Sequence, residues 1–191
     1  HEWAHGFIAY KLGDKTAKYE GRLTLNPIKH IDPLGAAALI LFKFGWAKPV
    51  PIDPRNFKHP KVGMALTALA GPTSNLLAAV LGAIIFNILC LFYIPLDYFK
   101  YIALFFSSFI SINVGLAVFN LIPLPPLDGS KVLSIFLPDK ILYKFYQYRL
   151  YIEMVVFALL FMGVLSGPIY FIQEKVFNFI VWLANIPFGR G

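Results

Sequence analysis

The sequence predicts an all-α polytopic membrane protein, a transmembrane helical bundle with a small β-hairpin or re-entrant segment beside its first helix. Hydrophobic residues make up 58% of the 191 residues and charged residues 14%, and the mean hydropathy is +0.67. Soluble domains carry about 25% charged residues. Two stretches, residues 62–94 and 101–127, contain no Lys, Arg, Asp or Glu. Each exceeds the roughly 20 residues that a spanning helix needs.

The first 60 residues predict shorter elements. A helix is expected from the first residue onward, and the sequence YEGRLTL at residues 19–25 then alternates partly, as a half-buried strand does, until Asn26-Pro27 ends it. Residues 34–44 are apolar but too short to span a bilayer, which favours a re-entrant or membrane-surface segment. A proline-rich loop follows at residues 45–60.

The remaining chain predicts four longer helices. They are expected to begin near Lys61, Lys100, Leu150 and Gly167. Gly71-Pro72 is expected to kink or interrupt the first of them, because proline lacks the N–H group of a helical residue. The second should stop near Pro123 for the same reason. No stretch is long enough for a separate soluble domain, so we expect one membrane-embedded domain over residues 1–191, an N-terminally truncated fragment because it begins inside a motif helix.

The distribution of Lys and Arg along the chain matches that of a membrane protein whose basic connections face the cytoplasm. The formal net charge is +7, and ten of the 17 Lys and Arg lie in residues 11–61, with four more in residues 131–149. By the positive-inside rule, the connections at residues 43–61 and 131–149 face the cytoplasm, and the turn near Pro95 faces outward. The predicted partner of this charge is therefore the lipid bilayer and not nucleic acid. A single cysteine, Cys90, excludes a disulfide framework within the chain.

The chain opens on an HExxH motif, His1-Glu2-Trp3-Ala4-His5. Residues four apart lie on one face of a helix, so both imidazoles can reach a single metal ion. Zinc held by two histidines and one further ligand keeps a position for water, and a neighbouring carboxylate such as Glu2 can take a proton from that water. The alternative is a fortuitous pair of helical histidines. The rarity of the motif in a chain with only four histidines favours the metal site.

Asp128 is the leading candidate for a third ligand. It follows three prolines in the sequence NLIPLPPLDG at residues 120–129, where the backbone must be irregular. An acidic residue at membrane depth is costly against lipid, and a cation is its natural partner. Asp128 would also suit as the N-cap of a helix that begins at Gly129, and the two roles can coexist. The metal pair elsewhere in the chain favours ligation.

Four motifs together indicate a family. They are HEWAHG at residues 1–6, LNPIKHIDPLG at residues 25–35, AGPTSN at residues 70–75 and NLIPLPPLDG at residues 120–129. With these motifs the chain resembles the site-2 proteases, the intramembrane zinc metalloproteases of peptidase family M50, and in particular their compact prokaryotic members without a PDZ domain. HExxH combined with a distant, membrane-embedded N-x-x-P-x-x-x-x-D-G motif is a highly specific combination.

The resemblance implies a role for each site residue. His1, His5 and Asp128 would hold one zinc ion, and Glu2 would act as the general base that activates water and later protonates the leaving amine. Asn75 and Asn120 are candidates for binding the substrate, although Asn75 could instead hydrogen-bond a neighbouring helix and Asn120 could brace the turn before Asp128. The implied activity is hydrolysis of peptide bonds in transmembrane protein substrates, in a prokaryotic cell membrane, with the active site toward the cytoplasm. The oligomeric state stays open.

Some assignments have competing explanations. His30 and Asp32 could orient a metal ligand or simply cap the local turn. We expect the strand at residues 19–25 to pair with an unwound substrate by β-augmentation. Two other functional classes are a catalytically silent membrane scaffold and a metal transporter. The presence of Glu2 argues against the scaffold, and the gathering of ionisable groups at one end of the long helices argues against the transporter.

Overall fold

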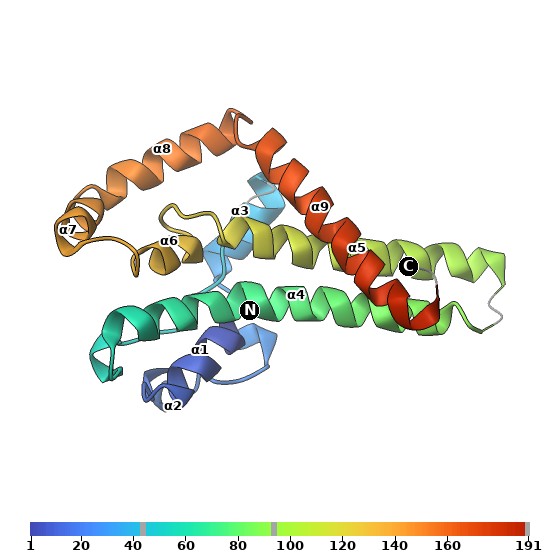
Figure 1. The fold of residues 1–191 in the computed structure, drawn as a ribbon, viewed down its shortest axis with the longest axis horizontal. Coiled ribbons are helices and arrows are strands. Elements are labelled where there is room, and N and C mark those ends of the chain that lie inside the picture. The colour runs from blue at the N-terminus through green and yellow to red at the C-terminus, as the bar shows by residue number, and fades with distance from the viewer. Residues whose placement is uncertain (43–44, 93–94, 190–191) are drawn as a thin grey trace. The chain divides into compact units, whose positions relative to one another are not determined.

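The chain divides into two compact units in the computed structural model, which describes residues 1–42, 45–92 and 95–189 (Figure 1). The first unit holds His1–Gly71 and Lys131–Leu137, and the second holds Pro72–Ser130 and the chain from Pro138 onward. Helices α4 (Pro60–Leu89) and α6 (Asp128–Leu133) have residues in both units. Each unit is described by itself below.

The first unit consists of short helices joined by irregular loops. They are α1 (Glu2–Lys11), α2 (Thr16–Tyr19), the 3-10 turns η1 (Pro27–Lys29) and η2 (Pro54–Asn56), α3 (Pro33–Phe42) and the first part of α4. Helix α1 ends at a turn in which Gly13 has φ 110°, a backbone conformation that side chains with a Cβ atom rarely adopt. The predicted segment at residues 34–44 includes residues outside the described ones. The placement of α3 in or on a membrane stays a prediction.

Asp14 joins the α1–α2 turn to the η2 loop. Its side chain is fully buried and accepts hydrogen bonds from the amide and hydroxyl of Thr16, from the side-chain amide of Asn56 (2.8 Å) and from the backbone amide of Asp53 (2.8 Å). Burial alone would raise the pKa of this carboxyl group, but the hydrogen bonds prevail and lower it below the usual value. The ionised Asp14 therefore holds two loops of this unit together.

The predicted β-hairpin is wrong. Among the described residues the structure has no strand, and the only ladder contact is a single antiparallel bridge between Ile31 and Ala47. The segment at residues 19–25 leaves α2 through a turn in which Gly21 has φ 63°, and this turn breaks the alternation that suggested a strand. Its next residue, Arg22, is buried and binds backbone carbonyls instead of pointing to solvent. The β-augmentation hypothesis therefore has no strand edge in this segment to rest on.

The second unit is a bundle of longer helices. It contains the rest of α4, α5 (Leu96–Asn120), the start of α6, α7 (Asp139–Gln147), α8 (Arg149–Phe161), α9 (Ser166–Asn185) and the 3-10 turn η3 (Ile186–Phe188). Helices α8 and α9 begin within one residue of their predicted starts, and α5 begins four residues earlier than predicted. We expected a kink or an interruption at Gly71-Pro72. Helix α4 continues through Pro72, so the interruption is not present, and the kink stays a prediction.

Small and β-branched residues form the core of this bundle. Helices α5 and α9 lie side by side (Figure 1). The buried members of the core cluster come from α4, α5 and α9 and are Ala79, Ala83, Ile110, Val114, Val118, Ile180 and Ala184. Asn87 on α4 also reaches α9, where its side-chain amide donates to the carbonyl of Ala184 (3.0 Å). The buried amide of Asn87 thus finds its hydrogen-bond partner within the bundle.

Within the described residues, two helices are long and apolar enough to cross a membrane, α4 and α5. Helices α8 and α9 meet at an 80° bend and would count as a third, broken span. Large apolar side chains remain exposed along the long helices, among them Leu77, Leu81 and Ile85 on α4 and Leu104, Phe105 and Ile112 on α5. A bilayer is the solvent that suits such surfaces, which supports the expected multi-pass membrane protein.

Candidate metal centre

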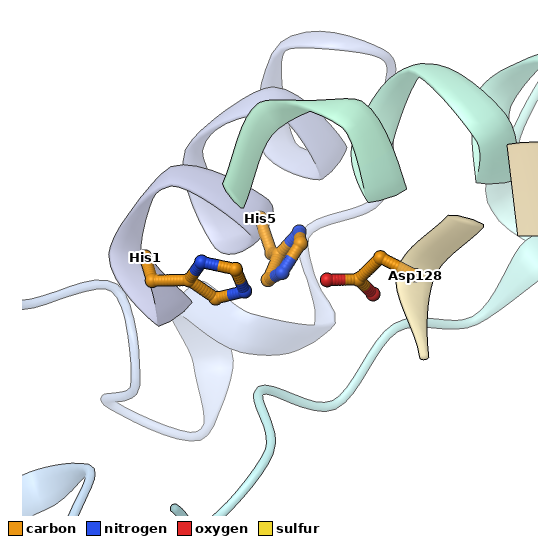
Figure 2. Close-up of side chains that lie close together, drawn as sticks. All are labelled: His1, His5 and Asp128. Carbon is orange, nitrogen blue, oxygen red and sulfur yellow. The ribbon is translucent and has the colours of Figure 1, made fainter. Parts of the chain in front are cut away.

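Helix α1 brings the two motif histidines together. The rings of His1 and His5 lie with their centroids 4.6 Å apart and their planes at 84° (Figure 2). His5 is buried and His1 is half-buried. The four-residue spacing therefore places both imidazoles on one face of the helix, as the sequence predicts.

Helix α4 sets the tautomer of the His5 ring. Its Nδ1 atom lies 2.7 Å from the backbone carbonyl oxygen of Thr67. A carbonyl oxygen only accepts hydrogen bonds, so Nδ1 carries the hydrogen and donates it, and the lone pair of the ring is presented at Nε2. Metal-binding histidines commonly have such a partner on their second nitrogen. Sequence reasoning missed Thr67, and no signal could have found it, because every residue carries a backbone carbonyl.

His30 and Asp32 turn out to stabilise local turns. The Nε2 atom of His30 lies 2.8 Å from the carbonyl oxygen of Thr24. The Oδ1 atom of Asp32 accepts hydrogen bonds from the amides of Leu34 and Gly35, both at 2.9 Å, where α3 begins. The turn-capping alternative, and not orientation of a metal ligand, is therefore the one that these contacts support.

Gly71 allows helix α4 to approach both histidine rings. A Cβ atom added at Gly71 would lie 2.6 Å from Cε1 of His1 and still closer to the ring of His5. No side chain fits at this distance without moving a ring. Gly71 belongs to the motif AGPTSN, but its role as the contact surface for the histidines is a finding of the structure.

Glu2 points its carboxylate at the backbone of residue 50. Its Oε2 atom accepts a hydrogen bond of 3.1 Å from the amide of Val50, and the side chain is half-buried. Glu2 thus follows His1 in the chain and is held by a residue outside α1. The sequence contains no signal for the Val50 contact.

Asp128 is the first residue of α6 and is buried, with 6% of its surface exposed. The loop before it includes a cis peptide bond between Pro125 and Pro126. A Cβ atom at Gly129 would collide with the backbone carbonyl oxygens of Leu121 and Ile122. Glycine is therefore required beside Asp128 because α6 starts against the end of α5.

The two candidate substrate-binding residues belong to the second unit. Asn75 lies in α4 and is buried. Asn120 is the last residue of α5, and one N–H of its side-chain amide donates to the carbonyl of Leu116 (2.9 Å). The first unit thus brings together His1, Glu2 and His5, and the second unit contains Asn75, Asn120 and Asp128.

The donor set suits zinc. His1 and His5 each offer one ring nitrogen and Asp128 one carboxylate oxygen (Figure 2). Two histidines and one carboxylate are a typical ligand set of catalytic zinc, which keeps a further position for water. Softer thiolate sites are excluded for this set, because it contains no cysteine.

Comparison with known proteins also points to a zinc-dependent peptidase. The model of peptidase family M50 matches residues 94–163. YwhC of Bacillus subtilis, named "Putative zinc metalloprotease", is 42% identical over 175 residues, which cover 87% of this chain and 77% of YwhC. No solved structure gives a significant match.

Two further relatives are also described as "Putative zinc metalloprotease". Rip2 of Mycolicibacterium smegmatis is 31% identical over 138 residues, 70% of this chain and 51% of Rip2. MJ0611 of Methanocaldococcus jannaschii is 42% identical over 138 residues, 70% of this chain and 63% of MJ0611. The chain thus spans about half the length of Rip2 and a larger part of the other two. With the histidine pair on α1, the helices long enough to cross a membrane and these relatives, the chain belongs to peptidase family M50 and is an intramembrane zinc metalloprotease.

Proposed function

We propose that His1, His5 and Asp128 hold one zinc ion, and that Glu2 is the general base for hydrolysis of peptide bonds in or beside transmembrane segments. The observation that carries this proposal is the histidine pair of α1, in which the carbonyl of Thr67 sets the tautomer of His5 and Gly71 gives room to both rings. With two nitrogen ligands from the histidines, the third protein ligand of zinc can be a carboxylate, and Asp128 has a buried carboxylate. Because these ligands come from both units, we propose that residues 1–191 work as one domain.

Each proposed residue has one chemical task. If bound by these ligands, zinc would act as a Lewis acid and lower the pKa of a water molecule bound to it toward about 7. Glu2 takes a proton from the attacking water as the oxygen adds to the scissile carbonyl carbon. It then gives the proton to the amine nitrogen as the C–N bond breaks. The amide of Val50 holds one carboxylate oxygen of Glu2 during these proton transfers.

Asn75 and Asn120 are proposed to bind the backbone of the substrate. A transmembrane helix hides its carbonyl groups in its own hydrogen bonds, so a cleaved segment must unwind and needs new partners. A side-chain amide offers both donors and an acceptor. One N–H of the Asn120 side chain donates to the carbonyl of Leu116. Its other N–H and its oxygen have no hydrogen-bond partner among the described residues, so both can serve a substrate.

The proposed location is a prokaryotic cell membrane with the site toward the cytoplasm. Support comes from the basic residues, which are concentrated in residues 11–61 and 131–149 around the motif segments. The proposed partners are transmembrane protein substrates and the surrounding lipid. A silent scaffold or a metal transporter is not favoured, because the relatives are named as zinc metalloproteases.

Cleavage of a labelled single-span substrate in detergent tests the proposal. A chelator should abolish cleavage and added zinc should restore it. Glu2→Gln should keep its zinc and cleave roughly 100-fold more slowly or worse, the usual contribution of a general base. Asp128→Asn should bind zinc more weakly. Asp97→Asn is the matched control, because Asp97 is an exposed carboxylate in the first turn of α5.

Each variant can contradict one part of the proposal. Zinc-dependent cleavage that persists at the normal rate in Glu2→Gln would remove Glu2 from the mechanism. Zinc affinity equal to that of the unchanged protein in Asp128→Asn would remove Asp128 from the ligand set. Cleavage that resists chelation would rule out the metal mechanism altogether.

A further inference from the structure

The sequence Pro49-Val50-Pro51 crosses helix α1 at the general base. Proline has no N–H group, so Val50 supplies the only backbone donor of these three residues. That donor is used on Glu2, whose Oε2 atom it meets at 3.1 Å. One turn further along α1, a Cβ atom at Gly6 would lie 3.2 Å from Cγ1 of Val50. The segment therefore lies directly on the helix that carries the HExxH motif.

A buried arginine holds this segment in place. The Nη2 atom of Arg22 donates to the carbonyl oxygens of Lys48 (2.7 Å) and Pro49 (3.3 Å). The amide of Lys48 donates to the carbonyl of His30 (2.9 Å). The carbonyls of Lys48 and Pro49 and the amide of Lys48 are thus fixed, and the Val50 amide has little freedom to leave Glu2.

Burying Arg22 to hold a loop costs the folded chain stability. Its surface is 6% exposed, no carboxylate pairs with it in the described part of the chain, and its Nε atom has no hydrogen-bond partner there. A buried charge without a counter-charge normally costs stability. A positioning role at a reacting group gives such a residue a function that an apolar side chain could not perform.

The contact makes the two oxygens of Glu2 different. Oε2 is engaged by Val50, whereas Oε1 makes no hydrogen bond with any described residue. A carboxylate pinned at one oxygen cannot rotate about its last side-chain bond without breaking that hydrogen bond. Oε1 is then the oxygen that is left to accept a proton.

We propose that Arg22 and the Val50 amide are positioning residues for Glu2: Arg22 holds the carbonyls of residues 48 and 49, and this aims the Val50 N–H at Oε2 so that Oε1 accepts the proton. The inference rests on the proposed role of Glu2 as the general base. It assigns no contact with substrate to either residue. Loss of the device should slow the chemical step and leave substrate binding and zinc binding unchanged.

Four variants of the full chain test this, each measured for kcat and KM on the labelled substrate and for zinc content. Val50→Pro removes the N–H, and Arg22→Ala removes the clamp. Both should lower kcat about tenfold to 100-fold, the range that a displacement of about 1 Å of a catalytic group produces. KM should stay within about twofold, and zinc should stay at one ion per chain. Arg22→Lys keeps one donor and should fall between Arg22→Ala and the unchanged protein.

Ile52→Pro is the matched control, because it adds a proline to the same loop at an amide with no hydrogen-bond partner among the described residues. It should keep the kcat of the unchanged protein. The inference is overturned if Val50→Pro or Arg22→Ala keeps the full kcat, or if kcat falls only where zinc is also lost. Failure of the underlying proposal looks different, since Glu2→Gln would then remain active.

Discussion

Alanine at position 71 should weaken zinc binding because it forces a histidine ring to move. The added Cβ atom would stand 2.6 Å from Cε1 of His1, whereas ordinary contact begins at 3.4 Å, so that ring must retreat by about 0.8 Å. The ring of His5 is closer still and is held by its 2.7 Å hydrogen bond to Thr67. Metal sites tolerate errors of only about 0.2 Å in ligand distance. The required movement is several times larger.

The expected loss of zinc affinity is about tenfold to 100-fold, comparable with the loss of a group that orients a metal ligand. In free energy this is about 1.4 to 2.8 kcal/mol. Competition for zinc against a chelator of known affinity measures it, with circular dichroism as the check on folding. Gly167→Ala is the control, because a Cβ atom there meets nothing within 4 Å.

The control also matches the local backbone. Gly71 and Gly167 each lie in a helix and each precede a proline, so any cost of alanine before proline applies to both variants. Zinc affinity that falls equally in both would show that the proline neighbour, and not the histidine contact, is responsible. A Gly71→Ala protein that competes for zinc as well as the unchanged protein would refute the close-approach argument.

Two further predictions concern stability. Asp14→Asn should lower the free energy of unfolding by about 2 kcal/mol near neutral pH, since charged acceptors make the stronger hydrogen bonds. The pKa of Asp14 is lowered in the folded chain, so its contribution is complete above the ordinary carboxyl pKa and is lost as pH falls through the lowered value. Thermal unfolding followed from about pH 6 to pH 2 should therefore show a smaller acid-side decline in Asp14→Asn than in the unchanged protein. Gly129→Ala should destabilise by about 1–3 kcal/mol through overpacking against the carbonyls of Leu121 and Ile122, and chemical unfolding measures this.

Both predictions have clear contrary results. An Asp14→Asn protein whose unfolding follows the same pH curve as the unchanged protein would show that the hydrogen bonds to Asp14 add no stability. For Gly129→Ala, the matched comparison is again Gly167→Ala. Equal stability of these two variants would show that the end of α5 can move away from α6 at little cost.

The sequence predicted those parts of the fold that depend on local spacing and hydropathy. The histidine pair follows from a four-residue interval, and the long helices follow from charge-free stretches such as residues 62–94. The strand at residues 19–25 failed because seven alternating residues do not reveal that Gly21 takes a left-handed conformation or that Arg22 is buried. Alternation in a short window is weak when one turn residue can reverse it.

The contacts that position the site could not be predicted. The carbonyl of Thr67 and the amide of Val50 are backbone groups, which every residue except proline carries in full, so residue type gives no signal for them. The use of Gly71 depends on how closely two helices approach. By contrast, Asp32 carried a recognisable capping pattern, and the sequence left capping open as one of its two roles.

Thr67 and Gly71 are separated by one helical turn, and both face α1. The hydrogen bond to the carbonyl of Thr67 fixes the position of α4 along its own axis relative to the histidine rings. The lack of a side chain at Gly71 fixes the rotation of α4 about that axis, because only this residue fits against the rings. A screw motion by a single residue turns a helix by about 100° and shifts it by 1.5 Å, which would present Ala70 or Pro72 to the rings. We therefore expect α1 and residues 60–71 of α4 to move as one rigid piece. If the proposed transmembrane substrates enter by a helix movement, its hinges are expected elsewhere in the chain.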